Sequence, residues 1–338
     1  MRHFRNKSIY WVILGIMVPL FAQAHEAYVL PSADFQAGLH KTSLDIFQGL
    51  LTAGNIKVGL LIGIGILVAL VLNFKFQQTQ LAKNLAGKVE TLSTIGPLIL
   101  RLAIAASFFL GAVSGEFLGS ELSIKALPAT DLIHIGLLVI SVLVLLGLFT
   151  RLAALAALII FSLVAYHYHW YILTYLNYLG EIAVLLLFGS GKWSLDQLFF
   201  GSSSYLANWR KYETVIVRVC YGLALIYGAV SVKFLHPVLS LEVINNYHLT
   251  QFHWLFPSDP RLIVFGAALT ELTIGLFILL GFQLRLTVLV TLFYITLSLL
   301  FFRELVWPHL LLYGISFNLL VQRNQFSLDG FLEKKLAS

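Results

Sequence analysis

Apolar residues run along most of this chain in stretches that are long enough to cross a lipid bilayer. A membrane-spanning helix needs about 20 consecutive, mostly apolar residues, and such stretches begin after a mixed, polar region at residues 25–54. The segments that we predict as helices are 55–73, 95–116, 132–149, 151–168, 173–189, 213–234, 261–281, 283–301 and 306–322. The pattern therefore predicts an all-α, polytopic transmembrane helical bundle of about nine transmembrane helices.

Two parts of the chain repeat the same features in the same order. The run 111–114 (Gly-Ala-Val-Ser) follows Arg101 at the spacing at which the identical run 228–231 follows Arg218. Further along, each copy carries a Gly-x3-Arg and closes with Ser-Leu-Asp. These later motifs are Gly147 to Arg151 and Ser194-Leu195-Asp196 in the first copy, and Gly281 to Arg285 and Ser327-Leu328-Asp329 in the second. Repetition at this long period indicates a duplicated unit, and any pocket is expected between the two halves.

The domain organisation that follows is one lead helix and two four-helix repeats. The expected parts are a signal peptide at 1–24, a short periplasmic segment at 25–54, the lead helix with a cytoplasmic linker at 55–94, repeat 1 at 95–200 and repeat 2 at 213–330. The Ser-Leu-Asp that closes each repeat predicts an N-capped interfacial turn.

Composition agrees with a membrane protein. The 338 residues are 59% hydrophobic and 11% charged, with a mean hydropathy of +0.88, which excludes an ordinary soluble domain. The net charge of +6 is distributed as a membrane topology requires, so no nucleic-acid partner is expected. The single cysteine, Cys220, lies in an apolar run and allows neither a disulfide framework nor a thiolate metal site within one chain.

The first residues have the form of a secretory signal. A basic start precedes an apolar core at 9–21 and an A-x-A site at 22–24, so cleavage would leave His25 as the mature N-terminus. Without cleavage the segment becomes a short additional anchor. The expected location is the bacterial inner membrane. A periplasmic N-terminus and nine crossings then place the C-terminus in the cytoplasm.

The basic residues support this orientation, because cytoplasmic segments of membrane proteins carry an excess of Lys and Arg. The inner segments hold Lys75, Lys83, Lys88, Arg151, Lys192, Arg210, Lys211, Arg285, Arg323, Lys334 and Lys335, and the outer ones hold Lys41, Lys57, Lys125, Lys233, Arg261 and Arg303.

With these motifs, the two copies resemble the DoxX/DoxD-like family of four-helix membrane proteins, as a tandem pair. The resemblance rests on the early Arg followed by a Gly, the Gly-x3-Arg and the Ser-Leu-Asp ending. The copies also differ, because Glu271 of the second aligns with Leu137 and Glu181 of the first aligns with Ile315. The resemblance implies a membrane redox partner, since the family includes a subunit of a thiosulfate:quinone oxidoreductase.

Four ionisable residues, Arg101, Glu181, Arg218 and Glu271, fall inside predicted spans. A charge in hydrocarbon is expected to face the bundle interior and to find a partner. We expect Arg218 to pair with Glu271, and Arg101 with Glu181. Such pairs have two interpretations: architectural salt bridges, or a proton or quinone-headgroup site in which the Glu exchanges a proton and the Arg stabilises the anion.

Every histidine after the signal lies on the outer side of this topology. Imidazole is a common metal ligand, and a copper or zinc cluster is one interpretation. Its candidate ligands are His25, His167, His169, His248, His253 and His309. The alternative is that these rings populate the membrane interface, because no recognised ligand spacing joins them.

Signals for soluble catalysis are absent from the sequence. There is no P-loop or GxSxG, and the Gly-x-Gly at 63–65 lies inside a predicted span. The longest outer loop, about 235–260, is a candidate lid. The expected function is a membrane-embedded accessory or quinone-interacting subunit of a redox system. A metal or small-solute binding or transport protein at the periplasmic face and a purely structural membrane partner are the alternatives. The oligomeric state and the enzyme question stay open.

Overall fold

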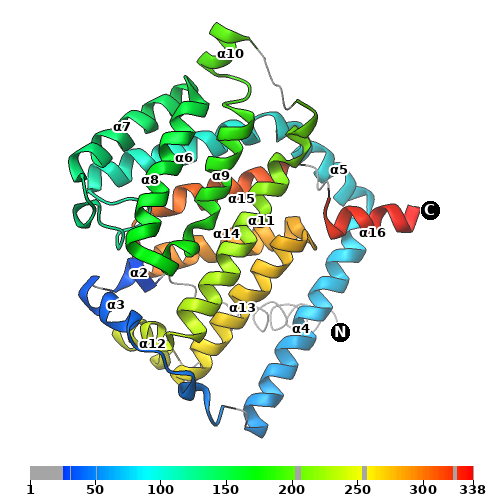
Figure 1. Ribbon diagram of the computed structural model, residues 1–338. Helices are drawn as coiled ribbons and strands as arrows, with labels where there is room; N and C mark the ends of the chain where they lie inside the picture. Colours follow the sequence, from blue (N-terminus) through cyan, green and yellow to red (C-terminus); the bar gives the residue numbers. More distant parts are fainter. Residues whose placement is uncertain are drawn as a thin grey trace.

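The structure is a computed structural model that describes residues 26–30, 32–50, 52–201, 207–252, 257–322 and 326–337. The expected signal peptide and its cleavage site lie outside these residues. Within them the protein is all-helical, without a β-strand (Figure 1). Its α-helices are α2 (Glu26–Val29), α3 (Ser32–Leu39), α4 (Ala53–Gln77), α5 (Gln80–Glu90), α6 (Gly96–Ser114), α7 (Thr130–Leu146), α8 (Thr150–Tyr168), α9 (Leu176–Phe188), α10 (Leu195–Phe200), α11 (Glu213–Gly228), α12 (Pro237–Asn246), α13 (Pro260–Leu280), α14 (Leu284–Phe302), α15 (Leu310–Val321) and α16 (Leu328–Ala337).

Several of these helices have the length and composition of membrane spans. In the described ranges, six helical segments qualify: α4, α6, α13, α14, Thr150–Phe188 and Asn208–Phe234. Two shorter apolar helices are Thr130–Leu146 and Trp307–Val321. The described part of the protein is therefore all-helical and contains six segments that could cross a membrane, and each apolar segment expected from the sequence overlaps one of these helices.

The long segment Thr150–Phe188 is a hairpin, because α8 and α9 pack against each other. A 3₁₀ stretch, His169–Tyr175, joins them, and His169 has a φ of 51° and a ψ of −131°. A non-glycine residue rarely adopts a positive φ, and a helix cannot continue through it. The chain thus reverses at His169.

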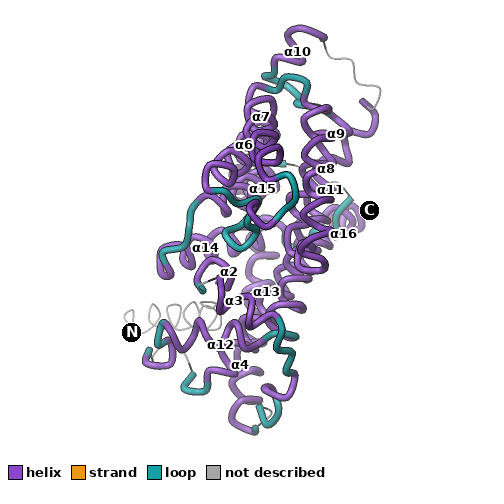
Figure 2. Tube along the Cα trace, turned by 60° about the vertical axis from the view of Figure 1, so that its left-hand side comes forward, coloured by secondary structure: helices purple, strands orange, loops and turns teal. Residues whose placement is uncertain are grey.

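Helix α11 continues into a π-helical stretch, Ala229–Phe234, and then into α12. Pro237 begins α12, where its fixed φ suits the first helical turn. The loop expected at 235–260 therefore contains a helix. Helix α12 packs against α2, α3 and α13, and both views show α3 and α12 toward one end of the molecule and α10 at the other (Figures 1 and 2).

The two halves of the chain are packed together. Helix α6 contacts α15, and α11 contacts both α9 and α13. Gly222 and Gly275 bring α11 and α13 close, because a Cβ atom at Gly222 would lie 2.8 Å from the Gly275 carbonyl oxygen. The lead helix α4 runs along the outside of this bundle with its spanning window unburied (Figure 1).

Candidate functional site

Lys233 forms a buried charge cluster with two glutamates. Its ammonium nitrogen lies 2.9 Å from Glu26 Oε1 and 3.2 Å from Glu271 Oε2. The three side chains are only 4%, 5% and 7% exposed, in that order. Ser240 on α12 donates a hydrogen bond to Glu26 Oε1. We call Glu26, Lys233, Ser240 and Glu271 the lysine site.

Four separate elements assemble the lysine site. Lys233 lies on the π-helical stretch after α11, Glu271 on α13, Glu26 at the start of α2, and Ser240 on α12. A π-helical turn is rare and frequently marks a functional position. Gly228, near the end of α11, lies beside this carboxyl group, because a Cβ atom there would lie 3.4 Å from Glu271 Oε1, in van der Waals contact.

The charges of the lysine site do not balance. Two carboxylates share one ammonium group, so the fully ionised site would carry a net charge of −1. An uncompensated charge in a buried, low-dielectric site is strongly disfavoured. The Glu271 Oε2 atom lies 3.2 Å from the Lys233 ammonium group, and no other described group donates a hydrogen bond to it. Binding of one proton or one small monovalent cation would therefore neutralise the site.

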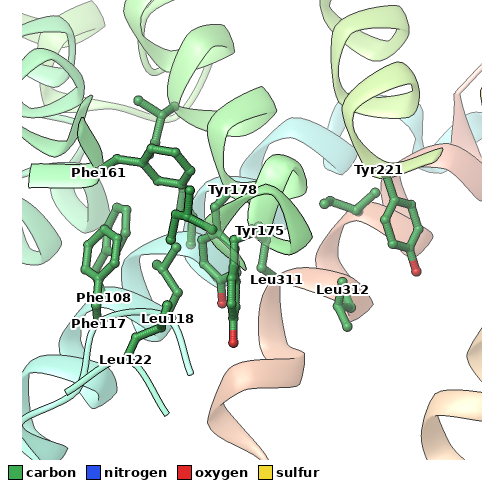
Figure 3. Packing of buried hydrophobic residues seen from close by; sticks show 14 of the residues in the cluster. Phe108, Phe117, Leu118, Leu122, Phe161, Tyr175, Tyr178, Tyr221, Leu311 and Leu312 are labelled. Carbon is green, nitrogen blue, oxygen red and sulfur yellow. The ribbon is translucent and has the colours of Figure 1, made fainter. Parts of the chain in front are cut away.

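A cavity of about 40 Å³ adjoins Lys233 and Glu271. Helix α9 contributes Tyr178 and α11 contributes Tyr221, so the cavity lies between the two halves. Figure 3 shows Tyr175 and Tyr178 on one side of Leu311 and Leu312, and Tyr221 on the other. A water needs roughly 10–15 Å³ of such volume, so the cavity is large enough for a water molecule or a small ion and too small for a quinone ring.

A second buried carboxyl group, that of Glu121, is hydrogen-bonded to two residues that line this cavity. Glu121 accepts hydrogen bonds from Tyr171 at 2.9 Å and from Tyr175 at 2.5 Å, and both tyrosines line the cavity. Burial raises the pKa of Glu121, and the tyrosine hydrogen bonds oppose that rise only in part. Two tyrosines of the cavity wall are thus hydrogen-bonded to a carboxyl group that holds its proton more tightly than an exposed glutamate does.

Glu121 predicts a specific pH dependence of stability. Because its folded pKa is raised above the ordinary value of 4.5, its contribution is complete below that value and is lost as the pH rises through the raised pKa. Thermal unfolding in detergent should show the wild type losing stability across that window, while Glu121→Gln loses less. Parallel pH curves for the two proteins would contradict this assignment.

The two arginines expected in charge pairs bind backbone carbonyls instead. Arg101 donates to the carbonyl oxygens of Ser190 at 2.8 Å and Trp193 at 2.7 Å, and Arg218 donates to that of Phe326 at 2.8 Å. The expected pairing of Arg218 with Glu271 is wrong, since Glu271 pairs with Lys233. Arg101 likewise has no salt bridge to Glu181 among the described residues.

Each arginine holds a loop whose aspartate caps a helix. Asp196 accepts from the backbone amides of Phe149 at 2.7 Å and Thr150 at 3.0 Å, at the start of α8. Asp329 accepts from those of Gln283 at 2.7 Å and Leu284 at 2.9 Å, at the start of α14. The expected N-cap is also present, because Ser194 Oγ accepts from the Gln197 amide. The repeated motifs are therefore structural anchors.

These anchors predict equal effects in the two copies. Removing a side-chain cap costs about 0.5–2 kcal/mol of stability, and both aspartates also face an arginine. Asp196→Ala and Asp329→Ala should each lower the free energy of unfolding by about 1–2 kcal/mol. Denaturant unfolding checks this, and a loss confined to one variant would show that the two ends are not equivalent.

Sequence reasoning missed Lys233, Glu26 and Glu121. The topology places Lys233 among the outer basic residues, although it lies within the predicted span 213–234. That position is the signal that could have found it, because an ionisable residue inside a span is a functional candidate by default. Glu26 was assigned to a short periplasmic segment. Only the folding of α2 and α12 over the end of the bundle buries it.

The described histidines do not gather. In the ranges that the structure describes, no group of three His, Cys, Asp or Glu side chains has a geometry that would hold a metal. His309 lies 2.9 Å from Glu304, and His167 packs edge-on against Tyr168. His169 lies at the α8–α9 reversal and His248 follows α12. Two further candidate ligands, His25 and His253, lie outside the described residues.

Comparison of the chain with protein-family models, with curated proteins and with solved structures gives no significant match. The site therefore has to be interpreted from its own chemistry.

Proposed function

We propose that this protein exchanges protons at the lysine site, within a bacterial inner-membrane bundle of nine crossings. The observation that carries the proposal is the excess carboxylate: Glu26 and Glu271 share one buried ammonium group beside a cavity of about 40 Å³. A proton neutralises this arrangement, fits the cavity and needs no additional ligands. Taking up the proton converts one carboxylate to a carboxylic acid, and releasing it restores the charge.

The proposed topology is a lead helix and two DoxX-like four-helix repeats, with a periplasmic N-terminus and a cytoplasmic C-terminus. Its support is the α8–α9 hairpin, the two shorter apolar helices and the matching arginine and aspartate contacts of the two copies. Reporter fusions should place Gly201 and the C-terminus in the cytoplasm and Asn245 in the periplasm. A cytoplasmic report at Asn245 would contradict the nine crossings.

The proposed setting is that of an accessory or quinone-interacting subunit of a membrane redox system. Its support is the sequence resemblance together with a proton site, because reducing a quinone takes up protons along with electrons. A quinone ring would require the cavity between Tyr178 and Tyr221 to open. The alternative, binding or transport of a metal ion or small solute at the periplasmic face, has no ligand cluster within the described residues to support it.

The test is proton transfer by the purified protein in liposomes. The vesicles enclose a pH-sensitive dye, and a potassium gradient with valinomycin sets the membrane potential. Wild-type protein should acidify the lumen faster than empty vesicles do. Glu271→Gln should reduce the rate to that of empty vesicles. The site then holds one ammonium and one carboxylate, so it is neutral without an additional proton and does not bind one.

Glu242→Gln is the matched control, since Glu242 is a half-buried glutamate of α12 outside the lysine site. It should transfer protons at the wild-type rate. Equal rates in wild type and Glu271→Gln would contradict the proposal. Extraction of quinone from the purified wild-type protein would support the redox setting, and a quinone-free preparation from quinone-containing membranes would count against it.

A further inference from the structure

A second and larger cavity lies along the same two helices as the lysine site. It has a volume of about 140 Å³, and its wall includes Glu181 and Val184 of α9 and Glu213 of α11. Thr94, just before α6, and Pro97, in its first turn, also line it. The lysine-site cavity is lined by residues 177–178 of α9 and 221–228 of α11. The larger cavity therefore lies toward the C-terminal end of α9 and the N-terminal end of α11.

Glu181 is a buried carboxyl group that forms no salt bridge with any described cation. It is 2% exposed, and its Oε2 atom has no hydrogen-bond partner in the described part of the chain. The nearby cations are occupied or lie elsewhere on the cavity wall. Arg210 donates to the Phe188 carbonyl oxygen at 3.0 Å, and Arg151 donates to that of Leu187 at 3.1 Å.

The other charged groups on the wall of the cavity do not neutralise Glu181. They are Glu213, which adds a second negative charge, together with Arg210 and Lys192. The side chains lining the cavity from Ser93 to Leu98 are all neutral. No salt bridge joins Glu181 to any described cation. An ionised, unpaired carboxylate at this depth is disfavoured, and a proton is the smallest ligand that relieves it.

We propose that Glu181 is a second proton-binding residue and that the larger cavity is its water-filled access route. At the roughly 30 Å³ that each water takes up in the liquid, a volume of about 140 Å³ holds about five waters, enough for a short chain to the carboxyl group. A hydronium ion in the cavity gives its proton to a Glu181 oxygen and leaves a water molecule behind.

Glu181 also lies close to the lysine-site cavity. Tyr178, which lines that cavity, precedes Glu181 on α9 by one helical turn, about 4.5 Å along the axis. The helices α9 and α11 approach closely here, because a Cβ atom at Gly180 would lie 2.6 Å from Cys220 Cβ. Both proton sites thus lie along the contact between α9 and α11. A proton route between them rests on the proposed proton exchange at the lysine site.

Infrared difference spectroscopy tests the Glu181 site directly. At neutral pH, wild-type protein should show the stretching band of a protonated carboxyl group that is missing in Glu181→Gln and shifted in Glu181→Asp. Glu213→Gln should retain this band, which separates the two glutamates of the cavity. Spectra of Glu181→Gln and Glu181→Asp that both match the wild-type spectrum would overturn the proposal.

A labelling experiment tests the access route. In a Cys220→Ala background, Thr94→Cys places a thiol on the cavity wall, and Thr91→Cys places one on the same short helix but outside it. A bulky, membrane-impermeant thiol reagent at position 94 should slow the deuterium exchange of the Glu181 band several-fold. The same label at position 91 should leave the exchange unchanged.

Equal exchange rates for the two labelled proteins would overturn the route. The outcome is independent of the lysine site, whose own carboxyl signal is removed by Glu271→Gln and not by Glu181→Gln. A wild-type spectrum that contains the Glu181 band but no carboxyl band sensitive to Glu271→Gln would therefore count against the proposed function and leave this second site standing.

Discussion

Replacing Lys233 by methionine is expected to lower the free energy of unfolding by about 3–5 kcal/mol, the largest single effect that we predict. The substitution removes the only cation within salt-bridge distance of Glu271 among the described residues, and it also removes the ion pair of Glu26. Methionine nearly preserves the volume, so the loss reports the unpaired carboxylates. Denaturant unfolding of the protein in detergent measures it.

The double variant Lys233→Met with Glu271→Gln separates charge from packing. It leaves one ionisable carboxyl group where the single variant leaves two, so it should recover a substantial part of the loss. Lys125→Met is the control, because Lys125 is exposed and lies away from the site; surface substitutions usually change stability by less than about 0.5 kcal/mol. A loss of that small size in Lys233→Met would contradict a buried, ion-paired lysine.

Gly222→Ala is expected to separate α11 from α13 and to destabilise the protein by about 1–3 kcal/mol. A Cβ atom at this position would lie 2.7 Å from the Leu279 amide nitrogen and 2.8 Å from the Gly275 carbonyl oxygen. Both neighbours are backbone atoms, so neither can move aside by a change of rotamer. Since α13 carries Glu271 and α11 leads directly into the π-helical stretch that carries Lys233, the variant should also slow proton transfer in the liposome assay.

Gly136→Ala is the matched control for this helix contact. Its added Cβ atom would lie 3.5 Å from Ile160 Cδ1, an ordinary van der Waals distance, and alanine is the better helix former. It should leave stability unchanged or raise it slightly, at an unchanged rate of proton transfer. If Gly222→Ala behaved like Gly136→Ala, the close approach of α11 and α13 would not be what holds the site together.

The apolar helices and the capped turns were predictable because local signals determine them. Apolar runs located the spanning helices, and the Ser-Leu-Asp motifs located the capped turns. The two arginines were correctly identified as buried groups that require partners. Their partners are the carbonyl groups of the capped loops, and backbone acceptors leave no mark in a sequence.

The lysine site was not predictable, because its residues come together only through tertiary contacts. Glu26 and Glu271 are far apart in sequence. Ser240 reaches Glu26 only because residues 237–246 form helix α12, which the sequence pattern presents as a loop. The π-helical stretch that carries Lys233 departs from the period of 3.6 on which a helical face is assigned. The expected pairing of Glu271 with Arg218 fails because Lys233 lies 3.2 Å from Glu271, whereas Arg218 binds the Phe326 carbonyl group.

The most direct test of the central claim is an infrared count of the protonated carboxyl groups at the lysine site. We predict that Glu271→Gln and Glu26→Gln each remove the same single carboxyl band at neutral pH, because either change leaves one carboxylate to one ammonium group. The band should be insensitive to replacing sodium by choline, which separates a proton from a bound cation. Spectra identical to wild type in both variants, or a band that appears only without sodium, would contradict proton exchange at this site.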